Sequence, residues 1–95
     1  MPNFMVRVVL HSKNHDHPSY TALHLAMEAA GFSRKIINNG ISFHLPTAEY
    51  IKSGAFTIEG IQSMARNIAN GIDIDNGVVT AESFKLFAFA GLKRV

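Results

Sequence analysis

The chain has 95 residues, a length that allows one domain (residues 1–95) around one hydrophobic core. Hydrophobic residues make up 47% of it and charged residues 17%, which excludes a disordered tail. Nine Lys and Arg against seven Asp and Glu give a net charge of +2, so the basic pI of about 9.2 rests on two excess charges.

The residue types that are missing exclude several further classes. The chain contains no cysteine, which excludes disulfide scaffolds, thiolate zinc sites and cysteine nucleophiles. No apolar run approaches the ~18 to 20 residues of a membrane span, and Arg7 interrupts the apolar stretch near the N-terminus, unlike the core of a secretory signal. We therefore expect a soluble, cytoplasmic protein with no membrane partner.

The first half of the chain predicts a strand, a loop and a helix. Residues 3–11 alternate between two faces, and the inward face carries the apolar side chains Phe4, Val6, Val8 and Leu10. A polar loop over residues 12–17 leads to Pro18, which suits the first turn of a helix. Gly31 is expected to end that helix as its C-terminal cap.

The second half predicts a hairpin region, a second helix and a last strand. Residues 32–37 are extended, Asn38-Asn39-Gly40 forms a tight turn, and residues 41–45 form a strand with which residues 48–52 pair as a hairpin. Thr57 is the N-cap of the second helix, and Gly71 closes it. The last strand is expected over residues 72–80, and the tail over residues 82–95 packs back as a short helix or an added strand.

The order strand, helix, strand, strand, helix, strand predicts an α+β fold. Short connections and right-handed crossovers favour the ferredoxin-like βαββαβ sandwich, a four-stranded antiparallel sheet with both helices on one face and a short C-terminal extension. The open face of the sheet would then carry Arg7, Val9 and His11, with Asp73 and Asp75 beside them.

Four segments of the sequence resemble a known family. They are the strand at residues 4–10, the helix exit LHLAMEAAGFS at residues 23–33, the segment LPTAEY at residues 45–50, and IDID at residues 72–75 running on through Val79 and Thr80 into the tail. Together they are similar to the endoribonuclease antitoxins of type V toxin–antitoxin systems, the GhoS-like family.

The resemblance implies a ferredoxin-like fold and an RNase that cleaves selected mRNA, including the transcript of a small membrane-acting toxin. In the antitoxin, the first helix is richer in arginine, whereas this chain has Ala22 and His24 in that stretch. Function therefore transfers less directly than fold.

Candidate catalytic residues come from the histidines. Four of the five fall between His11 and His24, around the junction of the first strand and the first helix. Histidine suits the acid and base roles of metal-independent RNA cleavage, because its ordinary pKa of about 6.5 lies near neutral pH. We hypothesise that His11 and His24 approach each other across the loop. The alternative is that both are ordinary polar residues of the sheet and the helix.

Four basic residues are candidates for contact with RNA phosphates. Arg7 and Arg34 can bind phosphate through two hydrogen bonds, and Lys13 and Lys35 add positive charge. The first strand offers no outward aromatic residue, so base stacking on the sheet is a weak alternative.

The sequence predicts no resident cofactor and leaves a divalent metal open. Asp73 and Asp75 lie two residues apart, hence on one face of the predicted last strand, and are weak candidates for a Mg²⁺ site; pairing with Arg7 or simple solvation is the commoner role of such residues. The predicted partner is single-stranded RNA or mRNA. The alternative function, from another class, is a non-catalytic homodimeric module that associates through its sheet.

Overall fold

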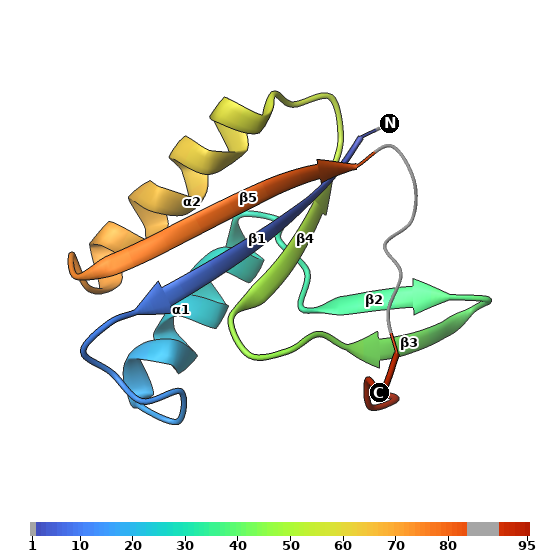
Figure 1. Ribbon diagram of the computed structural model, residues 1–95, viewed down its shortest axis with the longest axis horizontal. Coiled ribbons are helices and arrows are strands. Elements are labelled where there is room, and N and C mark those ends of the chain that lie inside the picture. Colours follow the sequence, from blue (N-terminus) through green and yellow to red (C-terminus); the bar gives the residue numbers. More distant parts are fainter. Residues whose placement is uncertain (1, 84–89) are drawn as a thin grey trace.

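The computed structural model describes residues 2–83 and 90–95, and in them it contains two helices and five strands (Figure 1). In chain order these are β1 (Asn3–Leu10), α1 (Pro18–Ala29), β2 (Lys35–Asn38), β3 (Ile41–His44), β4 (Glu49–Ser53), α2 (Ile58–Ile72) and β5 (Asn76–Ser83). This arrangement confirms the α+β class. Neither helix is long and apolar enough to cross a membrane.

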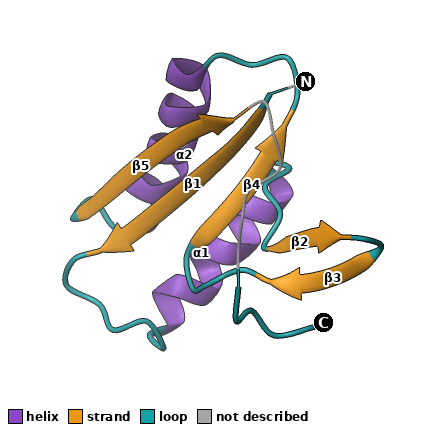
Figure 2. Cartoon of the chain, turned by 45° about the vertical axis from the view of Figure 1, so that its right-hand side comes forward, coloured by secondary structure: helices purple, strands orange, loops and turns teal. Residues whose placement is uncertain are grey.

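The strands form two separate sheets rather than the single four-stranded sheet expected from the sequence. β1 is the central strand of a three-stranded antiparallel sheet with the order β4-β1-β5, and β2 and β3 form a separate two-stranded sheet. Figures 1 and 2 show both helices on one face of the larger sheet, while the β2–β3 hairpin extends to one side of it.

The four-stranded prediction is wrong because the hairpin predicted around residues 38–40 forms a sheet of its own. Asn39 and Gly40 have positive φ angles of 52° and 76°, which form a two-residue turn that pairs β2 with β3. β4 pairs with β1 instead of returning as the partner of β3. Within the described residues, Ser33 alone extends the larger sheet beyond β4, through two backbone hydrogen bonds of 2.8 and 2.9 Å with Ile51.

The hydrophobic core lies between the larger sheet and the two helices. The inward residues of β1 that were predicted from its alternation, Phe4, Val6, Val8 and Leu10, are all at most 2% exposed. Opposite them lie the fully buried side chains of the helices, which are Leu23, Met27, Ile61, Ala65 and Ala69. The period of two along β1 and the helical spacing of the apolar residues in α1 and α2 thus meet in one core.

Three of the four helix ends follow the predicted capping signals, and the end of α2, expected at Gly71, does not. His17, the residue before Pro18, is the N-cap of α1, and its Nδ1 accepts a hydrogen bond of 3.1 Å from the Ser19 N–H. Gly31, with a φ of 90°, ends α1, and the N–H of Phe32 donates to the carbonyl of Met27 at 3.0 Å. At the start of α2, the Thr57 Oγ1 accepts a hydrogen bond of 3.0 Å from the Gly60 N–H.

The last strand begins four residues later than predicted. α2 continues through Gly71 to Ile72, because Ile72 falls on the same helical stripe as the buried Ile61, Ala65 and Ala69. Asp73 and Asp75 therefore lie in the turn before β5, where the Asp75 N–H donates to the Asp73 Oδ1 at 3.0 Å. The prediction that they share a strand face is wrong.

β5 lies at one edge of the larger sheet, and the α2 residue Gln62 reaches it. The Gln62 Nε2 donates a hydrogen bond of 3.1 Å to the carbonyl of Val78, and the Gln62 Oε1 accepts one of 2.5 Å from the Thr80 hydroxyl. The side chain of one helix residue thus holds two consecutive inward-facing residues of the edge strand.

The last residues of the chain return to the hairpin. The N–H of His44 donates to the carbonyl of Lys93 at 2.8 Å, and the N–H of Val95 donates to the carbonyl of Ser42 at 3.0 Å. The end of the tail therefore forms an isolated bridge between Arg94 and Phe43 of β3, and residues 90–95 form neither the short helix nor the full strand that was expected. Phe84, Phe87 and Phe89, also expected to pack on the body, lie outside the described residues.

Candidate functional site

A polar cavity lies where the end of α1 meets the base of the β2–β3 hairpin. Its volume is about 400 Å³, and its lining consists of Glu28, Ser33, Arg34, Lys35 and His44. It brings together two of the four basic residues predicted to contact phosphate, Arg34 and Lys35. The other walls come from α1 and from β3.

Local backbone pairing fixes the residues of the cavity. The two-residue turn sets a register in which Lys35 lies directly opposite His44. The N–H of Leu45 donates to the carbonyl of Arg34 at 2.9 Å, which closes the base of the hairpin. The Lys35 N–H also donates to the Ser33 Oγ at 3.1 Å. The backbone of Arg34 and Lys35 is therefore fixed by hydrogen bonds at the base of the hairpin.

The charges of the cavity suit an anion with several oxygen atoms. Arg34 and Lys35 supply two positive charges and many hydrogen-bond donors, and Glu28 supplies one carboxylate. A guanidinium matches the geometry of a phosphate through two parallel hydrogen bonds, whereas an ammonium acts as a point charge. His44 adds an imidazole, a side chain that serves as an acid or a base in proton transfer.

His24 lies one helical turn before Glu28 on the same side of α1, next to two tyrosines. Its Nδ1 is 2.6 Å from the Tyr50 Oη, and the centres of these two rings are 5.9 Å apart. The ring of Tyr20 lies on the other side, with its centre 6.4 Å from that of His24. The Tyr20 hydroxyl in turn accepts a hydrogen bond of 2.9 Å from the Leu10 N–H. The ring of His24 is therefore held in place.

The protonation of this pair follows from its surroundings. Burial lowers the pKa of His24 and the Arg34 charge lowers it further, while the Glu28 charge opposes the change. Burial also raises the pKa of the Tyr50 phenol well above its ordinary value. The phenol of Tyr50 donates to the His24 Nδ1 when the proton of the neutral ring is on Nε2, and accepts from it when that proton is on Nδ1. In either form the hydrogen bond fixes the orientation of the imidazole.

The lowered pKa of His24 predicts a specific dependence of stability on pH. Below about pH 6.5 the unfolded chain takes up a proton at His24 that the folded chain resists, so the free energy of unfolding falls as the pH falls through this range. It levels off once the folded ring is protonated too. The slope from this group cannot exceed about 1.4 kcal/mol per pH unit.

Urea denaturation between pH 8 and pH 5 measures this effect. The curve of His24→Gln against pH is expected to be flatter than that of the wild type, because glutamine does not titrate. His15→Gln is the matched control, since His15 is exposed in the loop before α1. Equal slopes for the wild type and His24→Gln would contradict the assignment of a lowered pKa to His24.

The remaining predicted residues lie away from the cavity. His11 follows the end of β1, on the side of the larger sheet away from the hairpin (Figure 1), and it shares no hydrogen bond or ring contact with His24 in the described part of the chain. Arg7 is exposed on the sheet face opposite the helices. The four basic residues therefore lie in three places: Arg34 and Lys35 at the cavity, Arg7 on the sheet, and Lys13 in the loop after β1.

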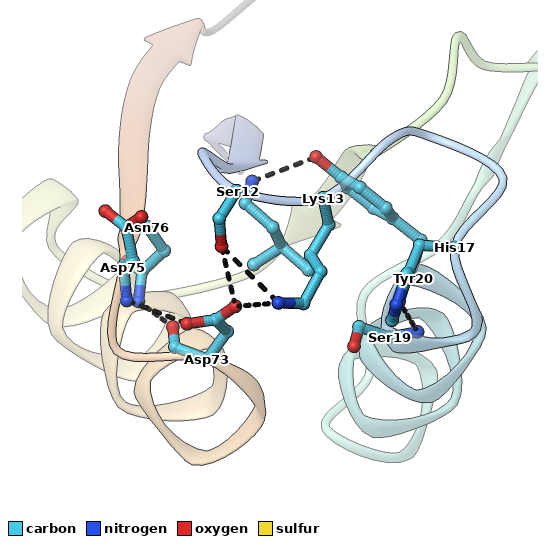
Figure 3. A network of polar contacts seen from close by, with 9 residues as sticks. Ser12, Lys13, His17, Ser19, Tyr20, Asp73, Asp75 and Asn76 are labelled. Carbon is cyan, nitrogen blue, oxygen red and sulfur yellow. Dashed lines mark hydrogen bonds and ion pairs between the residues drawn. The ribbon is translucent and has the colours of Figure 1, made fainter.

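Lys13 and the two aspartates form a network of their own at the end of α2 (Figure 3). The Lys13 Nζ lies 3.4 Å from the Asp73 Oδ2, and the Ser12 hydroxyl also donates to that oxygen, at 3.5 Å. The hydrogen bond from the Asp75 N–H lowers the pKa of Asp73, and Lys13 and Ser12 lower it further. Asp73 thus links the loop after β1 to the turn before β5. Residues 2–83 and 90–95 contain no group of three side chains suited to hold a metal ion.

Three residues of this region, Glu28, His44 and Tyr50, were not among the sequence-based candidates. A signal for His44 was present, because a two-residue turn at Asn39-Gly40 pairs residue 35 with residue 44. Glu28 follows His24 by four residues, which places both on one side of a helix. Tyr50 had no such signal, since its approach to His24 depends on the pairing of β4 with β1.

Comparison of the chain with protein-family models, with curated proteins and with solved structures gave no match.

Proposed function

We propose that this chain is a ferredoxin-like protein, related to the endoribonuclease antitoxins, that binds single-stranded RNA in the cytoplasm and cleaves it at the cavity between α1 and the hairpin. The observation that carries the proposal is the convergence of Arg34, Lys35, His44 and Glu28 on one cavity of about 400 Å³. These residues together supply phosphate binding and proton transfer.

The order of the elements supports a ferredoxin-like fold with an altered fourth strand. β1, β4 and β5 have the places of three strands of that fold, with the two helices between them in the chain and on one face. The Ser33–Ile51 bridge has the place of the fourth strand, reduced to one residue. The β2–β3 hairpin is then an insertion between this residue and β4.

A second cavity next to the first favours a polymer over a small anion. This cavity, of about 360 Å³, shares His44 with the first and is also lined by Leu45, Pro46, Thr47, Gly91, Leu92 and Lys93. An extended strand can run from one cavity to the other across His44, with Lys35 and Lys93 near successive phosphates. Two small cavities that share one residue suit a single strand, whose bases and phosphates can be splayed out along them.

The residues of the first cavity suit cleavage through the 2′-hydroxyl of RNA. A base takes the proton of the 2′-hydroxyl, the 2′-oxygen attacks the phosphorus, and the bond from phosphorus to the 5′-oxygen breaks as an acid protonates that oxygen. The products are a 2′,3′-cyclic phosphate and a 5′-hydroxyl. His44 and Glu28 are the acid and base of this proposal, and Arg34 and Lys35 neutralise the phosphate. In this proposal His24 is a positioning residue, held by Tyr50 one helical turn before Glu28.

Fluorescence anisotropy with a labelled single-stranded RNA tests the binding part of the proposal. Arg34→Glu and Lys35→Glu are each expected to weaken binding about tenfold or more and to reduce its dependence on salt. Arg66→Glu is the matched control, because Arg66 is an exposed arginine on α2 whose Nε donates a hydrogen bond to the Asn70 Oδ1 and which does not line the cavity. It should bind RNA like the wild type.

Gel analysis of the same RNA, with and without a chelator, tests the cleavage part. Cleavage is expected to persist with the chelator and to stop on a 2′-deoxy substrate, because the 2′-oxygen is the nucleophile. Binding that all three charge reversals weaken equally would show that the cavity is not the binding site. Intact RNA with the wild-type protein under every condition would reject the nuclease and leave an RNA-binding protein.

A further inference from the structure

The face of the larger sheet that points away from the helices carries a mainly aliphatic surface. We call this surface the open face and define it by Met5, Arg7, Val9, Glu49, Ile51, Val79 and Ala81, which alternate with the core residues of the three strands. Val79 is 69% exposed and Val9 is 42% exposed. Both helices pack on the opposite face, as Figure 2 shows.

The composition of the open face favours a protein partner over RNA. Among the described residues its only charged side chains are Arg7 and Glu49, and it has no Phe, Tyr or Trp ring on which a base can stack. A phosphate chain lying along it would meet one guanidinium beside one carboxylate, and otherwise aliphatic side chains. Exposed valines around a single opposite pair of charges fit another apolar surface with the same pattern.

The two charges of the open face are neighbours without being paired. Arg7 of β1 lies directly opposite Glu49 of β4 in the register of the sheet, and Met5 lies opposite Ile51 in the same way. Within the residues that the structure describes, neither the Arg7 guanidinium nor the Glu49 carboxylate forms an ion pair. Each charge is therefore available to a partner that brings the opposite charge to it.

We propose that the open face is the interface of a homodimer whose two-fold axis runs parallel to the strands, between β1 and β4. Such a rotation lays β1 of one subunit over β4 of the other, so that Arg7 faces the partner's Glu49 and Glu49 faces the partner's Arg7. The same operation lays Met5 on the partner's Ile51. Two sheets stacked in this way have nearly parallel strands, which is a common packing of sheet on sheet.

The charges select this axis over the other simple ones. An axis directly above β1 brings Arg7 onto the partner's Arg7, and an axis across the strands lays each strand on its own copy. Only the axis between β1 and β4 satisfies both charges and pairs the two register neighbours Met5 and Ile51. The interface is on the side of the sheet opposite the helices, so it does not use the proposed RNA-binding residues.

Charge exchange provides the test, with mass measured by sedimentation equilibrium or light scattering over a range of protein concentrations. The wild type is expected to be a dimer at micromolar concentrations. Arg7→Glu and Glu49→Arg are each expected to raise the dissociation constant more than about 100-fold, because like charges then face each other at the centre of the interface. The double variant, with both changes, restores the opposite pairs and should dimerise like the wild type. Arg66→Glu, on α2, is the control.

A single cysteine gives an independent measurement, since the chain has none of its own. A thiol reagent is expected to label Met5→Cys more slowly as the protein concentration rises, because the dimer lays this position on the partner's Ile51. A wild type that stays monomeric at several hundred micromolar would overturn the proposal, as would a double variant no better than either single one. Slow labelling at every concentration would show instead that the chain covers its own open face. RNA binding lost in Arg7→Glu, with mass unchanged, would show that RNA uses the face.

Discussion

Replacement of His44 by alanine is expected to slow RNA cleavage by about 10²- to 10⁴-fold, the usual contribution of a general acid or base. His44 lines both polar cavities and stands opposite Lys35 in the hairpin, so its imidazole is the proton-transfer group nearest the path proposed for the strand. RNA binding should change much less, because Arg34 and Lys35 keep their charges. Single-turnover cleavage of an end-labelled RNA, with binding measured in parallel, separates the two effects.

The control for this prediction is His11→Ala. His11 is exposed just beyond the end of β1, next to Gly77 of β5. It does not line the cavity. Its removal should leave the cleavage rate within about twofold of the wild type. If His11→Ala loses activity while His44→Ala keeps it, the reaction occurs at the junction of the first strand and first helix instead.

Replacement of Leu23 by alanine is expected to lower the free energy of unfolding by about 2–5 kcal/mol, through lost burial and the cavity that remains. Leu23 is 0% exposed and lies in the core between α1 and the larger sheet. Domains of this size are stable by roughly 5–15 kcal/mol, so the change removes a large part of the total. Urea denaturation of the two proteins measures it.

Leu25 offers the matched control on the same helix. It is 67% exposed two residues further on, so Leu25→Ala should change the free energy of unfolding by no more than about 0.5 kcal/mol. Equal effects of the two substitutions would mean that α1 presents a different side to the sheet. Because the pair differs only in position along one helix, general effects of leucine loss cancel.

Local sequence patterns predicted most of the elements but not how the strands combine. The alternation of β1, the caps at Pro18, Gly31 and Thr57, and the turn at residues 38–40 all depend on neighbouring residues, and each is present in the structure. Whether β4 pairs with β3 or with β1 depends on contacts between distant segments, which one sequence does not reveal.

The candidate site was predictable to the same limited degree. The sequence identified Arg34, Lys35 and His24, because the types of these residues suggest phosphate binding and proton transfer. It did not predict that His24 would be held by Tyr50, since these residues lie 26 positions apart and meet only in the folded sheet. His11 was grouped with His24 by closeness in the chain, and Lys13 with Lys35 by charge, and the fold brings neither pair together.

The hold of Gln62 on β5 has a consequence for how this protein avoids aggregation. An edge strand of eight residues is a template on which another strand can add, through its outward carbonyl and N–H groups. Here the carboxamide of Gln62 already occupies the carbonyl of Val78 and the hydroxyl of Thr80. An incoming strand must first displace this side chain. The residue Gln62 of α2 therefore opposes the addition of further strands at this edge of the sheet, which is the step by which fibrils grow.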